Sequence, residues 1–198
     1  MKPDETIKVG GFSVEVRRKR VKSIHLHVEP SGHLWLSAPY RCPTAALTKM
    51  VADRLVWVRR QMAQFDELRA TPRLWGTPLD DAVPPLALDA LYRRELAQAA
   101  AGLAAHYEPL VGRSASAWRF RWMKTRWGSC HPATGRITLN LALAALPSIY
   151  LHQVVVHELV HLRASGHGPE FYRLMDLYMP TWRSVRRAMR GIVPLRPT

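Results

Sequence analysis

Apolar and polar residues alternate near the beginning of the chain, and this pattern predicts β-strands. Ile24, Leu26 and Val28 are separated by polar residues, and the alternation resumes at Leu34 after a Pro-Ser-Gly-His segment at 30–33. A period of two places the apolar side chains on one face of a strand, and the intervening segment has the composition of a turn. We therefore expect a β-hairpin with one buried face in the first 40 residues.

Apolar residues recur every three or four positions in much of the remaining chain, which is typical of amphipathic helices. A second hairpin is expected from arms at 118–128 and 136–140, joined by a Pro-Ala-Thr-Gly turn. The expected helices lie at 43–69, 86–110, 148–163, 169–179 and 181–190. Strands and helices in this order predict an α+β fold.

A segment with four prolines at 71–85 divides the sequence. We expect an N-terminal β-hairpin region and helix at 1–70, a linker loop at 71–85 and a core at 86–198. A chain of 198 residues has the size of one ordinary domain, so we expect these parts to form one compact domain overall.

The composition is that of a globular protein, with 47% hydrophobic and 22% charged residues. No apolar stretch approaches the roughly 20 residues that a membrane helix needs. Residues 1–6 have no apolar core of the kind found in signal peptides. Two cysteines do not make a disulfide framework. We therefore expect a cytoplasmic protein.

The net charge of +14 favours an anionic partner, and nucleic acid is the first candidate. A second interpretation is open, because an arginine-rich, alanine-rich and proline-rich composition can also reflect the base composition of a genome. One basic cluster interleaves with aromatic residues at 118–127. This cluster is either a surface that stacks bases or a strand with one buried aromatic face.

The segment His157-Glu158-Leu159-Val160-His161 carries the clearest chemistry. Residues four apart lie on the same face of a helix, so both imidazoles can reach one metal ion, and this spacing is that of zinc hydrolases. His167 follows a Ser-Gly segment that can reverse the chain. Three nitrogen ligands would leave one position open for water, as in catalytic zinc sites. The alternative is a core helix whose histidines only make hydrogen bonds.

Glu158 is the only acidic residue between Pro109 and Pro169. A buried carboxylate without a partner is costly, and a metal-bound water would be a compensating partner. The other histidines are weaker candidates. His152 lies roughly 140° around the helix from His157 and cannot share its face. His25 and His27, two apart on a strand, could chelate an ion or be solvated.

The region around this motif resembles the YgjP-like metallopeptidases, a family of small bacterial relatives of the SprT-like zinc peptidases. The matching segments are Arg126–Cys130, Gly135–Asn140, Pro147, Val154–Leu162, Gly166-His167 and Phe171. The resemblance implies a zincin-like single domain, with a small, mostly antiparallel sheet packed on helices that include the HExxH helix. A metzincin motif would need glycine where this chain has Ala164.

The resemblance also implies zinc on His157, His161 and His167, with Glu158 as the catalytic acid/base. We therefore expect a zinc-dependent metallopeptidase that hydrolyses peptide or protein substrates through a metal-activated water, with Glu158 as general base. Two alternatives stay open. One is a metal-dependent hydrolase of a non-peptide substrate such as a nucleotide, and the other is a nucleic-acid-associated module with a vestigial zinc site.

Several residues near the motif are candidates for further roles. Tyr172 or Arg126 could contact an oxyanion or the substrate. Cys130 is a candidate near-site thiol or a redox-sensitive one, but we favour the interpretation that it is a buried small hydrophobic residue. The strand at Arg136–Asn140 is expected to be a sheet edge that accepts an extended peptide.

Overall fold

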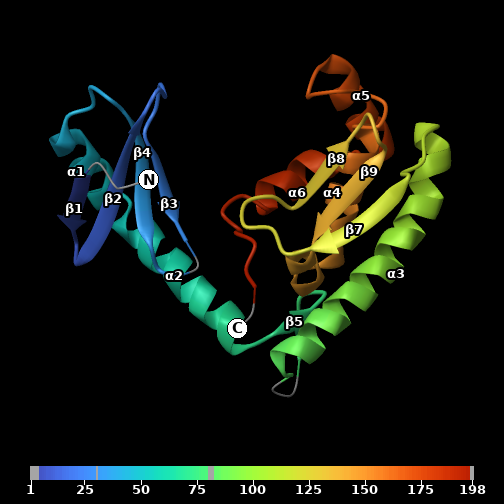
Figure 1. Ribbon diagram of the computed structural model, residues 1–198, viewed down its shortest axis with the longest axis horizontal. Coiled ribbons are helices and arrows are strands. Elements are labelled where there is room, and N and C mark those ends of the chain that lie inside the picture. The colour runs from blue at the N-terminus through green and yellow to red at the C-terminus, as the bar shows by residue number, and fades with distance from the viewer. Residues whose placement is uncertain (1–4, 30, 80–82, 197–198) are drawn as a thin grey trace. The chain divides into compact units, whose positions relative to one another are not determined.

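The computed structural model describes residues 5–29, 31–79 and 83–196, and the chain forms two compact units, Met1–Glu67 and Leu68–Thr198 (Figure 1). Each unit combines strands with helices, so the α+β class is confirmed. The expected division into 1–70, 71–85 and 86–198 includes residues 1–4, 30, 80–82 and 197–198, which lie outside the described part of the chain.

The first unit contains a four-stranded sheet with the strand order β1-β2-β4-β3. The strands are β1 (Glu5–Val9), β2 (Phe12–Lys19), β3 (His25–Val28) and β4 (Leu34–Pro39). The predicted hairpin is confirmed as the antiparallel pair β3–β4, in which Leu26 lies opposite Leu36. The parallel pairing of β2 with β4 was not expected from the sequence.

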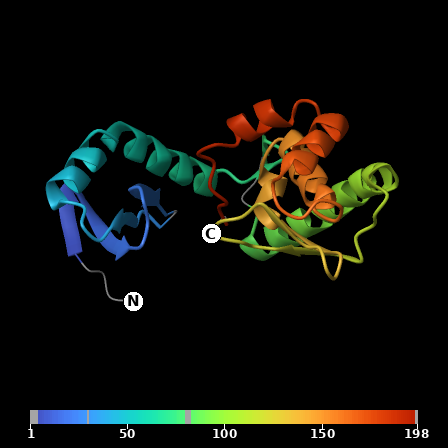
Figure 2. The same ribbon diagram turned by 90° about the horizontal axis from the view of Figure 1, so that it is seen from above.

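Two helices, α1 (Thr44–Ala52) and α2 (Leu55–Ala70), lie against one face of this sheet (Figure 2). The prediction of a single helix over 43–69 is therefore wrong. The Asp53 and Arg54 backbone N–H groups bond to the carbonyl oxygens of Lys49 and Val51, which closes α1 with a tight turn. No glycine or proline marks this break, so it has no local signal in the sequence.

The second unit contains a three-stranded sheet with the order β7-β9-β8. Its strands are β7 (Ala117–Arg121), β8 (Gly128–His131) and β9 (Arg136–Asn140). β8 and β9 form an antiparallel hairpin, whereas β7 runs parallel to β9. The expected hairpin arm at 118–128 is wrong, because residues 122–127 cross the end of β9 and place β8 on its other side. β9 is therefore the central strand, and the expectation that it forms a sheet edge is also wrong.

The helices of the second unit lie on the inner side of this sheet (Figure 2). They are α3 (Pro85–Val111), the 3₁₀ helix η1 (Leu141–Ala145), α4 (Ser148–Val160), α5 (Pro169–Tyr178) and α6 (Trp182–Ala188). Figure 2 shows α4 between the sheet and the helices α5 and α6. In the described part of the chain, no helix is both long enough and apolar enough to cross a bilayer.

The apolar character of α4 explains its central position. Leu151, Val155 and Leu159 are buried on one side of the helix, and Val156 and Val160 are buried on another. A helix that is hydrophobic nearly all round is stable only when it is covered on all sides. α4 therefore forms the middle of the core, and it carries the HExxH motif there.

The segment expected to be a plain linker loop at 71–85 contains a small hairpin. Its strands are β5 (Arg73–Leu74) and β6 (Thr77–Pro78). Trp75 and Gly76 both have positive φ, as a type I′ hairpin turn requires. The Trp75 N–H donates to the Ala144 carbonyl at 2.7 Å, which holds this hairpin against η1.

Candidate metal centre

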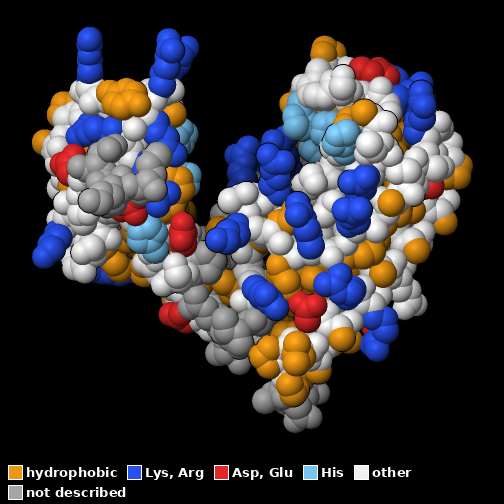
Figure 3. All heavy atoms as spheres, viewed as in Figure 1, with side chains coloured by type: hydrophobic (Ala, Val, Ile, Leu, Met, Phe, Trp, Pro, Cys, Tyr) orange, Lys and Arg blue, Asp and Glu red, His pale blue; other side chains and the backbone are white. Residues whose placement is uncertain are grey.

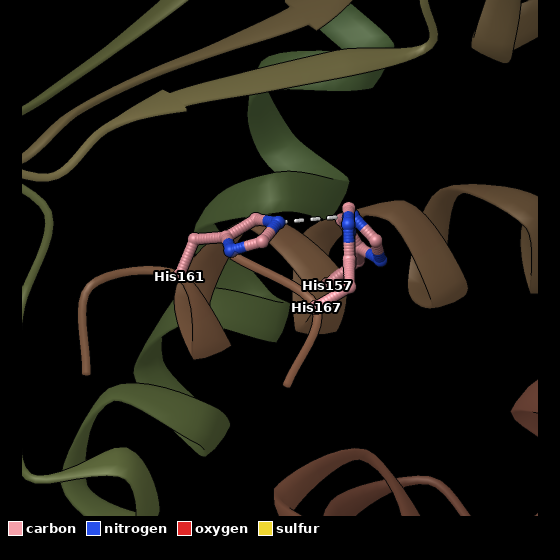
Figure 4. Close-up of side chains that lie close together, drawn as sticks. All are labelled: His157, His161 and His167. Atoms are coloured by element: carbon pink, nitrogen blue, oxygen red, sulfur yellow. Dashed lines mark hydrogen bonds between the residues drawn. The ribbon is translucent and has the colours of Figure 1, made fainter. Parts of the chain in front are cut away.

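The three histidines predicted as metal ligands lie together (Figure 4). His157 lies on α4, His161 follows one turn later as the C-cap residue of this helix, and His167 comes from the turn before α5. The Nε2 atom of His157 is 3.2 Å from the Nε2 atoms of both His161 and His167. One ligand atom from each residue lies within 4.8 Å of the others. The site therefore presents three imidazole nitrogens to one small volume.

This arrangement fits a first-row divalent metal. Nitrogens bound at 2.0–2.1 Å on tetrahedral corners lie about 3.3 Å apart. The two separations from His157 Nε2, 3.2 Å each, are close to this value. Burial lowers the pKa of His157 to about 3 and also lowers the pKa of His161. Both imidazoles are therefore neutral near pH 7, which is the form that binds metals.

The backbone after α4 orients one of these ligands. The Nδ1 atom of His161 is 3.2 Å from the carbonyl oxygen of Ala164. An Nδ1–H that donates to this oxygen leaves the Nε2 lone pair free, and such a hydrogen bond commonly fixes the tautomer of a metal-ligating histidine. Ala164 therefore contributes to the centre through its backbone, a role that its side chain does not signal.

Phe171 packs against all three rings. Its ring centroid lies 4.9 Å from that of His157, 4.7 Å from that of His161 and 4.6 Å from that of His167. The side chain is only 1% exposed and belongs to the first turn of α5. The ring of Phe171 thus restricts the orientations of the three imidazoles. Sequence reasoning quoted this residue in the motif but assigned it no role, although it lies four positions after His167.

Glu158 is a buried carboxylate, 5% exposed, and it projects from α4 towards β8. Burial raises its pKa to about 7, while a hydrogen bond from the Cys130 backbone N–H and the nearby positive charge of Arg126 act in the opposite direction. A cation held by the histidines would further favour the ionised carboxylate. Glu158 therefore combines a fixed orientation with a proton affinity suited to exchange near neutral pH.

Gly128 allows β8 to approach this carboxylate. A Cβ atom at position 128 would lie 2.6 Å from Glu158 Oε1, 2.7 Å from Val154 Cγ1 and 2.9 Å from Glu158 Cγ. These distances are too short for any side chain, so glycine is required here by space and not by backbone conformation. Sequence reasoning included Gly128 in the family motif without recognising this function.

Cys130, the candidate near-site thiol, lies beside Glu158. Burial, followed by the negative charge of Glu158, raises the pKa of its thiol to about 11. The thiol is therefore protonated near pH 7, and it behaves as a small, half-buried apolar side chain on the inner face of β8. The backbone of Cys130 reaches the carboxylate.

The two candidates for substrate contact have different neighbours. Arg126 is exposed in the segment before β8, and its charge acts on Glu158. Tyr172 is half-buried, with its ring 5.6 Å from Phe171 and stacked on Trp182 at 5.8 Å. Arg126 thus lies near enough to the carboxylate to lower its pKa, whereas Tyr172 contacts Phe171, which packs on the histidines.

The remaining candidate histidines are engaged elsewhere. The Nε2 atom of His152 lies 2.6 Å from the Tyr107 hydroxyl oxygen, on the side of α4 that faces α3. His27 stacks on Trp35, with the ring centroids 3.7 Å apart. His25 lies 3.2 Å from the Ser23 hydroxyl. Among the described residues, the only group of three or more potential metal ligands is the one on α4 and the following turn.

Asn140, at the end of β9, is fully buried and holds the segment that leads into β8. Its side-chain amide donates to the carbonyl oxygens of Met123 and Arg126, each at 2.7 Å. Its Oδ1 accepts from the backbone N–H groups of Met123 at 3.3 Å and Ala142 at 3.1 Å. Asn140 therefore fixes the crossing from β7 to β8, and with it the strand that contacts Glu158.

Comparison with known proteins is consistent with this site. The profile of the YgjP-like, metallopeptidase domain matches residues 77–191, which include the histidines, Glu158 and the three-stranded sheet. The site and the match together define a metallopeptidase domain. Because the match spans more than half of the chain, the protein belongs to the YgjP-like metallopeptidase family.

Two solved structures are similar to part of the chain. The crystal structure of the metallopeptidase zymogen of Pyrococcus abyssi abylysin is 24% identical, with 47% of this chain and 94% of that chain covered and a TM-score of 0.43. The metallopeptidase zymogen of Methanocaldococcus jannaschii jannalysin is 18% identical, with 46% and 92% covered and a TM-score of 0.40. No curated protein matches the chain.

We predict that Gly128→Ala destabilises the protein by about 1–3 kcal/mol, because the added methyl group must displace Glu158 or Val154 from a packed interior. Gly102→Ala is the matched control, since a Cβ at this position on α3 meets nothing within 4 Å. It should stabilise the protein by about 0.5–1 kcal/mol. Urea unfolding followed by circular dichroism measures both. Equal stabilities of the two variants would contradict the close approach of β8 to α4.

We also predict that Asn140→Ala lowers the free energy of unfolding by about 1–3 kcal/mol. The substitution removes the donors to the carbonyl oxygens of Met123 and Arg126 and the acceptor of the buried Ala142 N–H. Thr138→Ala is a suitable control, since Thr138 is buried on the same strand without a side-chain hydrogen bond in the described structure. The comparison uses the same urea titration. If Asn140→Ala cost no more than Thr138→Ala, the amide would not hold the crossing segment.

Proposed function

We propose that this protein is a zinc-dependent metallopeptidase that hydrolyses peptide bonds in peptide or protein substrates. One observation carries the proposal: three imidazoles converge beside a single buried carboxylate, that of Glu158. Membership of a metallopeptidase family supports the same chemistry.

Zinc is the metal that we assign to the centre. Three protein nitrogens with an open fourth position are typical of catalytic zinc, whereas structural zinc sites usually have four protein ligands. When bound, zinc would act as a Lewis acid on the scissile carbonyl and lower the pKa of water towards 7. His157, His161 and His167 would hold it, with Phe171 packed against all three rings and the Ala164 carbonyl next to His161 Nδ1.

We assign the role of general base to Glu158. Its carboxylate accepts a proton from the attacking water and then donates a proton to the leaving amine. The hydrogen bond from the Cys130 N–H keeps the carboxylate in one orientation, and the apolar side chain of Val154 limits water access to it. A pKa in the neutral range suits a group that must both accept and release a proton.

We propose that β8, and not β9, is the strand along which the substrate lies. β8 is an outer strand of the sheet among the described residues. The Trp127 carbonyl bonds to Asn140 on β9, so strand alternation directs the main-chain groups of Gly128 and Cys130 outwards. The Cys130 N–H on this side already contacts Glu158. A peptide added to this edge would therefore pass the carboxylate.

Arg126 is our first candidate for a contact to the substrate or to a developing oxyanion. It is exposed, it lies close enough to Glu158 to affect its pKa, and no carboxylate pairs with it in the described structure. Tyr172 is the second candidate, because the described residues leave its hydroxyl without a hydrogen-bond partner.

We predict that Glu158→Gln lowers kcat for peptide hydrolysis by about 10²–10⁴-fold, because the amide cannot accept the proton. The variant should still bind zinc through the unchanged histidines. Glu170→Gln is the control, since Glu170 is an exposed carboxylate paired with Arg173 on α5. It should keep its turnover. Full activity of Glu158→Gln, or turnover of nucleotides with none of any peptide in a library, would contradict the proposal.

We further predict that the purified protein binds one zinc ion per chain and that His167→Ala weakens zinc binding by at least about 100-fold, because it removes a direct ligand. Titration with zinc in competition with a chelating dye measures the affinity. His25→Ala is the control, because His25 is an exposed histidine that makes its contact with Ser23. Equal losses in the two variants would exclude the assigned ligand set.

A further inference from the structure

The outer face of the three-stranded sheet is distinct from the metal centre. Ile137 and Leu139 of β9 are fully buried and face α4. Because side chains alternate along a strand, the residues between them face the other way. The register places exposed side chains from β7, β9 and β8 on that outer face, namely Arg119, Arg121, Arg136 and His131.

The aromatic residues of β7 do not belong to this face. Trp118 and Phe120 are partly buried and pack against the core, so they lie on the inner side. Of the two interpretations of the basic–aromatic alternation, the structure supports the strand with one buried aromatic face. It does not support a surface that stacks bases. Any ligand of the outer face would meet guanidinium groups and small polar side chains.

The charged side chains on this face are all basic. None of the residues placed there is acidic, and residues 110–168 contain seven Lys and Arg against the single, buried Glu158. Arg119, Arg121 and Arg136 have no ion-pair partner among the described residues. Figure 3 shows Lys and Arg side chains spread over the side of this unit on which β7, β8 and β9 lie in Figure 1, with few acidic groups between them.

The spacing of the arginines is set by the sheet. Arg119 and Arg121 are two residues apart on one strand, which separates their Cα atoms by about 6.6 Å. Arg136 lies opposite Ala117 and is therefore a diagonal neighbour of Arg119. The strands thus present three guanidinium groups from a rigid support, and guanidinium groups bind phosphate in a bidentate manner.

A phosphate backbone suits this face better than a protein does. A stable protein interface usually has an apolar or aromatic centre, and this face offers arginine, histidine, serine and alanine instead. Binding of a nucleic-acid backbone needs mainly cations and hydrogen-bond donors. We propose that the outer face of the β7-β9-β8 sheet, through Arg119, Arg121 and Arg136, binds the phosphate backbone of nucleic acid without reading its sequence.

The test measures binding of the full-length protein to a fluorescein-labelled, mixed-sequence DNA oligonucleotide, single-stranded and as a duplex, from about 50 to 200 mM salt. The triple variant Arg119→Gln, Arg121→Gln, Arg136→Gln should bind at least about tenfold more weakly at the lowest salt. The slope of log K against log salt should become shallower by about 2 for single strands, since each lost phosphate contact removes about 0.7.

Two further triple variants keep the test decisive. Replacing the same arginines by lysine keeps the charge and should retain most of the affinity, which separates loss of charge from loss of fold. Replacing Arg54, Arg59 and Arg60, exposed in the first unit, by glutamine makes the same change in net charge away from the sheet. This control should keep the salt slope of the unchanged protein.

The proposal is overturned if the unchanged protein does not bind the oligonucleotide at about 50 mM salt, or if both glutamine variants lose affinity equally. A labelled poly-glutamate peptide serves as a probe for an acidic protein partner. Binding of this peptide through the three arginines, with no binding of the oligonucleotide, would also overturn it. Because the readout is binding and not peptide hydrolysis, the result is independent of the proposed peptidase activity.

Discussion

The burial of one carboxylate inside an apolar helix is the constraint on which this structure depends. Glu158 lies on α4 among valines and leucines, between the three-stranded sheet and the histidine cluster. A carboxylate in such surroundings is costly unless a hydrogen bond or a cation compensates for it. The Cys130 N–H provides the hydrogen bond, and the adjacent histidines form a place for the cation. Glu158 is thus both a packed residue of the core and a functional group of the proposed metal centre.

The architecture around Glu158 serves to bring β8 against α4. Gly128 removes the side chain that would collide with the carboxylate, and Asn140 fastens the segment through which the chain reaches β8. On the opposite side of the site, Phe171 holds the three imidazoles together. Elements distant in sequence therefore act on one small centre, which is consistent with a site that needs its groups pre-positioned.

The sequence predicts those parts of the fold that local pattern determines. The β3–β4 hairpin follows from its alternation, and α4 with the clustered His157, His161 and His167 follows from motif spacing on an apolar helix. The parallel pairing of β7 with β9 was missed, because a crossing segment of six residues carries no local signal of the side on which the next strand lies. The role of Asn140 was missed for a similar reason, since an amide at a strand end looks the same in sequence whether it is buried or solvated.

The most direct measurement of the metal centre is a crystal structure of the zinc-loaded protein with anomalous data collected on both sides of the zinc absorption edge. The account predicts one zinc peak about 2.0–2.1 Å from a ring nitrogen of each of His157, His161 and His167, with no fourth protein ligand. A peak coordinated by other residues, or a fourth protein side chain completing the coordination, would contradict it.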